Sequence, residues 1–336
     1  MMRTRTARIY RTALLGTAYF LAGAVLHAQQ PAQTRQASGR GAGSPPPIVQ
    51  EADIKKLTSH VWYIPDHSVQ GVPNVGIIVG DHATLVVDPG LGIRNGQAVL
   101  RAVGKLSKNT EMYVFTTHYH AEHITGVAAF PSSAKYIVSQ AEQKDIDELA
   151  PDFAKRFAGL SPAAADLLKD ATFRKPDITF EKTYDLDLGG VKVHLMAFGP
   201  THTRGDCAAW VVDGDMGVIF AGDIALNQTF LAYSQYSSTR AWYDALVALS
   251  KLKPASEAND AIIVPSHGPI GDPNMLFQQR SFLQSVQARE RQYKEEGKSE
   301  QEILQSVTDE MKDRYNLWNT PNRIANIVAN VYKELQ

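Results

Sequence analysis

The sequence predicts an α/β domain of layered sheets and helices, and three observations support this. Short apolar, β-branched runs bounded by turn residues recur between residues 60 and 268 and are interspersed with helical patterning. Four of these runs end in a His or Asp that could bind a metal, as expected where strand ends converge on one sheet edge. The chain after residue 275 is helical in pattern. With 336 residues and 44% hydrophobic content, the chain can bury a large core.

Residues 1–28 are predicted to be a secretory signal peptide. Four arginines and no acid lie in residues 1–11, residues 12–26 are almost wholly apolar or small, and Ala28 precedes a polar run. A membrane anchor is the alternative, but this apolar stretch is shorter than the roughly 20 residues that span a bilayer. We therefore expect export to the periplasm or secretion, with cleavage near Ala28 and no stable membrane anchor afterwards.

Residues 29–47 are predicted to be a disordered linker, and residues 48–336 a globular domain. The linker is rich in Gly, Ser, Gln and Pro and lacks large apolar side chains. The net charge of -1 gives no electrostatic reason to expect a nucleic-acid partner. Cys207 is the only cysteine, so neither an intramolecular disulfide nor a cysteine zinc cluster is possible, and we expect it to be a small buried residue.

The expected elements follow in order along the chain. Three early strands are expected at residues 60–65, 75–80 and 83–90, then a helix at 95–106 and a strand at 111–118. A helical insert at 139–170, either scaffold or lid, precedes strand-like runs at 178–188, 191–199, 207–214, 216–223 and 261–268, with a helix at 239–252. C-terminal helices occupy 275–336, where Ser299 and Glu302 form a capping box and Thr320 and Pro321 begin the last helix.

A histidine strip follows the strand at 111–118. The stretch TTHYHAEHITG contains His118, His120 and His123, with Glu122 before the last of them. Side chains at a strand end that continues into a turn can converge on one point, and imidazole and carboxylate groups are ligands for zinc, iron or manganese. Three solvated loop histidines would be the simpler explanation. Three further strand ends, however, each bear a residue of the same type, namely His202, Asp223 and His267.

Together these residues resemble the metallo-β-lactamase superfamily. Its H-x-H-x-D-H motif, followed by His, Asp and His, corresponds to HYHAEH, His202, Asp223 and His267, and the turn Asp88–Gly90 matches its early acidic turn. The resemblance covers roughly residues 50 to 275 and implies a four-layer αββα sandwich. It also implies one metal site formed by His118, His120 and His202, and a second formed by Glu122, His123 and His267, with Asp223 bridging the two.

Glu122 departs from the family pattern, which has Asp at this position. Its longer side chain could still reach the second metal, or could leave that site weak and act as a proton acceptor. The expected cofactor is zinc, two ions per chain, with iron or manganese as alternatives. Glu122 and Asp223 are the expected catalytic residues, which would orient the attacking water and take its proton.

The expected function is an exported metal-dependent hydrolase of a small molecule, in which a metal-activated hydroxide cleaves an ester, lactone, thioester or amide. A β-lactam is possible, although residues 224–228 offer no lysine or serine for its carboxylate. The alternatives are a mononuclear iron oxygenase of the persulfide-oxidising type and a non-catalytic metal-binding protein. His67 could contact substrate from a loop, and Tyr119 could either donate to an oxyanion or pack inward.

Overall fold

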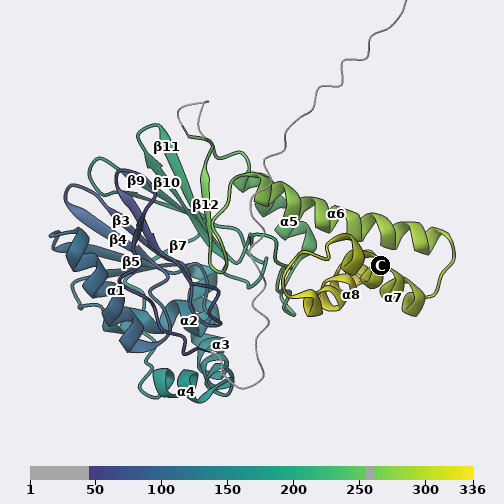
Figure 1. The fold of residues 1–336 in the computed structure, drawn as a ribbon, viewed down its shortest axis with the longest axis horizontal. Coiled ribbons are helices and arrows are strands. Elements are labelled where there is room, and N and C mark those ends of the chain that lie inside the picture. Colours follow the sequence, from purple (N-terminus) through teal and green to yellow (C-terminus); the bar gives the residue numbers. More distant parts are fainter. Residues whose placement is uncertain (1–44, 255–259) are drawn as a thin grey trace, which may run out of the picture. The chain divides into compact units, whose positions relative to one another are not determined.

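The computed structural model describes residues 45–254 and 260–336, which belong to one compact unit. The expected signal peptide and most of the linker lie outside the described residues. Pro47 is already buried, and its carbonyl accepts a hydrogen bond from Asn95 Nδ2, so packing begins here. Two sheets lie at the centre, with helices α1–α4 on one side and α5–α8 on the other (Figure 1).

The first sheet has seven strands in sequential order. They are β1 (Lys55–Lys56), β2 (Val61–Ile64), β3 (Val75–Val79), β4 (Ala83–Val87), β5 (Glu111–Phe115), β6 (Lys135–Ser139) and β7 (Ile178–Phe180). Strands β1 to β4 pair antiparallel, whereas β4 to β7 pair parallel. The helices that connect the parallel strands therefore cover the outer face of this sheet.

The second sheet has five strands in the order β12-β11-β10-β9-β8. They are β8 (Thr183–Asp187), β9 (Lys192–Ala197), β10 (Cys207–Asp213), β11 (Met216–Gly222) and β12 (Ile262–Pro265). Strand β10 is antiparallel to both β9 and β11, and β12 is parallel to β11. Strands β9, β11 and β12 consequently end at the same edge of the sheet.

Three layers of apolar side chains hold the sandwich together. Alternate residues of each strand point to opposite faces, so Ile78 packs between the sheets while Ile77 packs under the helices of the first face. Val211 and Phe220 reach the central layer from the second sheet. The expected αββα sandwich with C-terminal helices is confirmed.

The helices of the first face are α1 (Gly92–Leu106), α2 (Ala121–Ile124), η1 (Thr125–Ala129, a 3₁₀ helix), α3 (Gln140–Ala158) and α4 (Pro162–Leu168). Gly96 allows α1 to lie close against η1, because a Cβ at this position would stand 2.1 Å from the Gly126 carbonyl oxygen. Helices α3 and α4 form the expected insert, and Ser139 caps α3 by accepting from Glu142 N.

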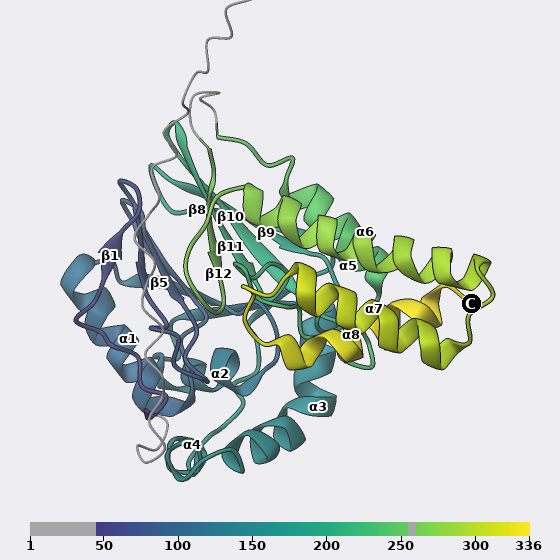
Figure 2. The ribbon, with the colours of Figure 1, turned by 45° about the vertical axis from the view of Figure 1, so that its right-hand side comes forward.

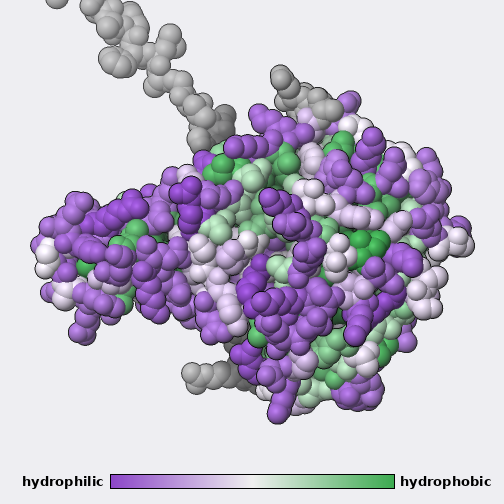
Figure 3. Space-filling view, turned by 180° about the vertical axis from the view of Figure 1, so that it is seen from behind, coloured by the Kyte–Doolittle hydropathy of each residue, from purple (hydrophilic) through white to green (hydrophobic). Residues whose placement is uncertain are grey.

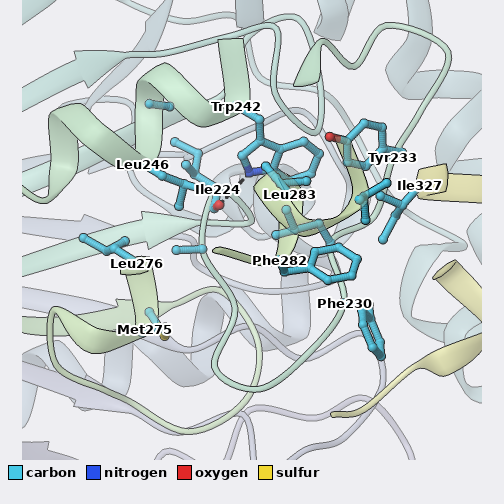
Figure 4. Packing of buried hydrophobic residues seen from close by; sticks show 14 of the residues in the cluster. Ile224, Phe230, Tyr233, Trp242, Leu246, Met275, Leu276, Phe282, Leu283 and Ile327 are labelled. Carbon is cyan, nitrogen blue, oxygen red and sulfur yellow. Dashed lines mark hydrogen bonds between the residues drawn. The ribbon is translucent and has the colours of Figure 1, made fainter. Parts of the chain in front are cut away.

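The helices of the second face are α5 (Thr239–Leu249), α6 (Asn274–Glu295), α7 (Glu300–Arg314), η2 (Pro321–Arg323, a 3₁₀ helix) and α8 (Ile324–Glu334). Trp242 of α5 is fully buried, and its Nε1 donates to the carbonyl of Ile224 (Figure 4). Phe282 of α6 and Ile327 of α8 belong to the same apolar cluster (Figure 4). This cluster also contains Ile224 and Phe230 of the loop that follows β11.

Some elements differ from the expectation. Strands β1 and β6 were not expected, and the single run expected at 178–188 forms β7 and β8, which lie in different sheets. Helix α1 begins three residues earlier than expected, and the last helix begins with the short η2. The capping box of Ser299 and Glu302 is present as predicted.

The surface of α6–α8 is mainly hydrophilic when the molecule is seen from behind (Figure 3). Within the described residues, no helix is both long enough and apolar enough to cross a membrane.

Candidate metal centre

The predicted site residues come from the ends of strands in both sheets. Strand β5 leads into His118 and His120, and α2 carries Glu122 and His123. In the second sheet, His202 follows β9, Asp223 follows β11 and His267 follows β12. Since these three strands end at one edge, the fold gathers their side chains beside the histidine strip.

Two groups of potential metal ligands result. The first comprises His118, His120 and His202, and the second comprises Glu122, His123 and His267; within each group the ligand atoms lie within 4.8 Å of one another. All six residues are buried or partly buried. These are the two groups that the motif predicted, including Glu122 in place of the usual aspartate.

Hydrogen bonds on the outer side of two histidines determine which nitrogen faces the centre. His202 Nδ1 lies 2.5 Å from the carbonyl oxygen of Ala232, and His267 Nδ1 lies 2.9 Å from that of Val72. Because a carbonyl oxygen only accepts, each Nδ1 carries the hydrogen. The Nε2 atom of each neutral ring therefore offers a lone pair to the centre.

Asp88 orients two further histidines. Thr117 Oγ1 donates to Asp88 Oδ2, so it can only accept from His118 Nδ1, which lies 3.2 Å away. Asp88 Oδ2 is also 3.1 Å from His123 Nδ1. Both rings are thus held with Nε2 inward, and neither Nε2 atom has a hydrogen-bond partner among the described residues.

These inner atoms fit a bound cation. His120 Nδ1 and His202 Nε2 lie 3.3 Å apart, a distance at which two lone pairs repel unless they share a proton or a metal ion. Glu122 Oε2 and Asp223 Oδ1 are likewise buried without a hydrogen-bond partner in the described part of the chain. Burying several acceptor atoms without a hydrogen-bond donor is costly. Imidazole nitrogens and carboxylate oxygens are also ligands that zinc prefers.

The two carboxylates lie at different places in the cluster. Asp223 Oδ2 is 3.5 Å from His202 Nε2, and the Asp223 charge also acts on His123 of the other group. Glu122 Oε1 is 4.0 Å from His267 Nε2. The extra methylene of Glu122 therefore does not remove it from the second group.

The surroundings shift the pKa values of three of these histidines in different directions. Burial lowers the pKa of His118 and His120 well below the ordinary value of 6.5. Burial also opposes a charged His123, but Asp88, together with Glu122 and Asp223, outweighs it and raises the pKa of His123 to about 9. Although burial would raise the pKa of Asp223, the surrounding histidines hold it below its usual range.

Polar side chains behind the centre hold its loops. Asp206 accepts hydrogen bonds from the backbone and hydroxyl groups of Thr201 and Thr203, which flank His202. Asn74 Nδ2 donates to the carbonyls of Pro265 and Gly268, which bracket the His267 loop. Each loop therefore has its own buried support.

The centre lies in the wall of a cavity of about 580 Å³. Phe153 and Phe157 of the α3 insert line it, and the Phe153 ring stacks on His120 at 3.8 Å between centroids. Asn319, Thr320 and Arg323 line it from the C-terminal segment. None of these five residues could be recognised as a cavity residue from the sequence, because apolar periodicity identifies a buried helix face but not the cavity that the rest of the helix adjoins.

The remaining sequence candidates are not members of the ligand groups, although the Tyr119 ring packs edge-on against His120 at 4.8 Å between centroids. His67 is partly exposed and is 3.1 Å from Asp53 Oδ2, while its neighbours Asp66 and Ser68 line the cavity. Tyr119 is buried and packs inward beside Phe153. Cys207 is fully buried on β10, as expected.

Comparisons with known proteins agree with this geometry. A family model described as the metallo-beta-lactamase superfamily matches residues 69–267. Among solved structures, a metallo-beta-lactamase from Pontibacter korlensis is similar with a TM-score of 0.52 and 20% identity, covering 69% of this chain and 98% of that one. No protein with a curated description matches the chain.

Two structures of the sec-alkylsulfatase Pisa1 are also similar. One is the stereoselective inverting enzyme from Pseudomonas sp., with a TM-score of 0.60, and the other is a double mutant, with a TM-score of 0.61. Each is 15% identical and covers 84% of this chain but only 50% of the sulfatase chain. At these identities the likeness concerns the fold.

Proposed function

Because this chain belongs to the metallo-beta-lactamase superfamily, whose members are mostly metal-dependent hydrolases, we propose that it hydrolyses a small ester, lactone, thioester or amide with two zinc ions per chain. The ligand set is His118, His120 and His202 for one ion and Glu122, His123 and His267 for the other, with Asp223 between them.

One observation carries this proposal. Both ligand groups have members in the wall of the same cavity, and the outer nitrogens of His202 and His267 are committed to backbone carbonyls. A purely structural metal site has no reason to adjoin a cavity of about 580 Å³. The arrangement therefore favours chemistry on a bound small molecule.

The residues around the centre supply orientation and proton transfer. When bound, divalent metals at such sites provide Lewis acidity, which makes water a nucleophile at neutral pH and withdraws electrons from the bond to be cleaved. Asp223 Oδ1 and Glu122 Oε2 have no hydrogen-bond partner among the described residues, so they can orient the attacking water and accept its proton. Phe153, stacked on His120, excludes water from one side of the centre.

The iron oxygenase alternative depended on Glu122 failing to reach a second metal. Its carboxylate lies within 4.8 Å of the ligand atoms of His123 and His267, so a two-metal hydrolase uses more of the buried ligands than a one-iron enzyme does. Residues 224–228 contain neither lysine nor serine to hold the carboxylate of a β-lactam.

The test measures metal content and turnover on the same samples. We expect close to two zinc ions per chain and hydrolysis of at least one member of a panel of chromogenic esters, lactones, thioesters and β-lactams. His120→Ala should lose metal and reduce kcat/KM by more than about a hundredfold, since even outer-shell changes cost 10 to 100-fold. His194→Ala is the matched control, because His194 pairs with Asp185 outside the centre.

Equal turnover by wild type and His120→Ala on every substrate would contradict the hydrolase proposal. One iron per chain with oxygen consumption would favour the oxygenase instead. Export belongs to the same proposal, and the N-terminal residue of the protein recovered from periplasm or medium tests it: a start close to Gln29 supports cleavage near Ala28.

A further inference from the structure

The C-terminal segment places a cation on the cavity wall. Arg323 lies at the end of η2, just before α8, and lines the same cavity as His120, His202 and Asp223. It comes from beyond residue 267, where the match to the superfamily model ends. Figure 2 shows that the segment between α7 and α8 lies at the end of these two helices that is nearer to the β-sandwich.

Arg323 forms no ion pair with the described acidic residues. Nη1 donates to the carbonyl of Phe230 at 2.9 Å, and this is the only hydrogen bond of its side chain within the described part of the protein. Asp223 influences its charge but does not come within 4.0 Å of it. Two further acids line the wall. Glu122 belongs to the second ligand group, and Asp66 accepts from the backbone N–H groups of Ser68 and Gly268.

The segment that carries Arg323 is held in place by backbone hydrogen bonds. Asn319 N donates to the Gln228 carbonyl at 2.8 Å, and Phe230 N donates to the Asn319 carbonyl at 3.2 Å. These bonds tie the segment before η2 to the loop that carries Asp223. Ile324, the residue after Arg323, is fully buried in the apolar cluster of the second face.

A partly buried guanidinium retains several donors that need an acceptor. Arginine has five N–H donors in a planar fork that matches carboxylate and sulfate oxygens. An N–H donor left without an acceptor at a partly buried position is costly. Burial lowers the pKa of Arg323 from its ordinary value, which is the sign of this cost, although arginine stays charged in proteins. Phe153, Phe157 and Leu226 give the same cavity an apolar surface.

We propose that Arg323 binds a carboxylate or sulfate group of the substrate, while Phe153 and Phe157 contact its apolar part. This inference rests on the proposed function, because it names the class of substrate that the same cavity accepts: an amphiphilic molecule with an anionic end. Arg323 is a specificity-determining residue that touches the substrate and takes no part in proton transfer.

Binding of inert probes tests the proposal without requiring turnover. The probes are 4-phenylbutanoate, the corresponding sulfonate and the neutral 4-phenylbutanamide, each titrated calorimetrically into zinc-loaded protein. We expect at least one anion to bind about tenfold to a hundredfold more tightly than the amide, and Arg323→Met to abolish that preference. Arg323→Lys should retain part of it. The better anion shows whether the site prefers a carboxylate or the sulfonate, which stands in for a sulfate.

The controls separate this inference from the proposed function. Arg291→Met removes an exposed arginine of α6 and should leave the preference unchanged. Thermal unfolding of Arg323→Met and Arg323→Lys checks that both variants fold. A wild-type protein that binds the anions no better than the amide overturns the proposal, and so does a preference that persists in Arg323→Met, which would mean that the anion binds the metals. The hydrolase proposal is tested separately, by the turnover of neutral esters and by its loss in His120→Ala.

Discussion

At the scale of single residues, Asp88 does more for the centre than its place outside the ligand set suggests. It stands at a positive φ of 54° and accepts from both the backbone N–H and the hydroxyl of Thr117. The same carboxylate faces His123 Nδ1. One side chain therefore sets the orientation of His118 and His123, which belong to different ligand groups.

Asp88→Asn should weaken metal binding while preserving the fold. Asparagine tolerates a positive φ, but its amide nitrogen is a donor. It would replace the oxygen that accepts from Thr117 Oγ1 and forms the ion pair with His123 Nδ1. We expect zinc affinity to fall by about 10 to 100-fold, the usual effect of losing an outer-shell partner. Competition with a chromogenic chelator measures it, and Asp185→Asn, which breaks an Asp–His pair outside the centre, is the control. Unchanged affinity in Asp88→Asn would show that Asp88 does not orient the ligands.

At the scale of elements, the sequence indicated most of the strands but not every pairing. The run at 178–188 has uninterrupted strand character, yet Glu181 and Lys182 turn the chain from one sheet into the other. Strand β6 escaped notice because Ser139 ends the strand and also caps α3, so its sequence blends into the helix. Sheet membership is decided by tertiary packing, which a local pattern does not contain.

The seven candidate metal ligands could be picked out from the sequence because each lies in the loop or short helix that follows a strand. Arg323 was not, because the apolar stripe of α8 shows which side is buried but not which loop its first turn meets. Phe153 and Phe157 were hidden for the same reason within α3. Residues that select a substrate are thus harder to identify from one sequence than residues that bind a metal.

Helix α8 depends on its buried face for its attachment. Ile327 is fully buried in the cluster that includes Phe282. Ile327→Ala should lower the free energy of unfolding by about 2 to 5 kcal/mol, through lost burial and the cavity left behind. Urea unfolding measures this, and Lys333→Ala, at an exposed position of the same helix, should change stability little. Equal effects of the two substitutions would show that α8 is not docked as described.

At the scale of the whole molecule, the centre is a shared product of both sheets and the C-terminal helices. His118 and His120 follow the first sheet, Asp223 and His267 follow the second, and Arg323 arrives from the last helical segment. The apolar layer between the sheets fixes the distance between the residues that follow the first sheet and those that follow the second. The position of Arg323 depends on the apolar cluster that packs α5–α8 onto the second sheet.

Stability should depend on pH through Glu290 of α6. Its side chain is 1% exposed, neither carboxylate oxygen has a hydrogen-bond partner among the described residues, and burial raises its pKa from 4.5 to about 8. Between these values the folded protein keeps a proton that the unfolded chain has lost. The contribution of Glu290 to stability therefore falls as pH rises from about 4.5 to about 8 and is constant above that.

Glu290→Gln should remove this dependence, because glutamine is neutral at every pH. We expect the variant to gain stability over wild type as pH rises, with the largest difference above about pH 8. Urea unfolding at several pH values measures it, with the exposed Glu295→Gln as control. A constant difference between variant and wild type across this range would show that Glu290 does not titrate as described.

The tie between residues 319–323 and the loop after β11 also has a consequence for the life of the polypeptide. All seven candidate metal ligands precede Arg323 in the chain and are therefore synthesised before it. Proteolytic clipping ahead of η2 would likewise spare all seven of them. If Arg323 selects the substrate as proposed, a chain clipped ahead of η2 would keep its candidate metal ligands and lose that selectivity, together with the buried face of α8.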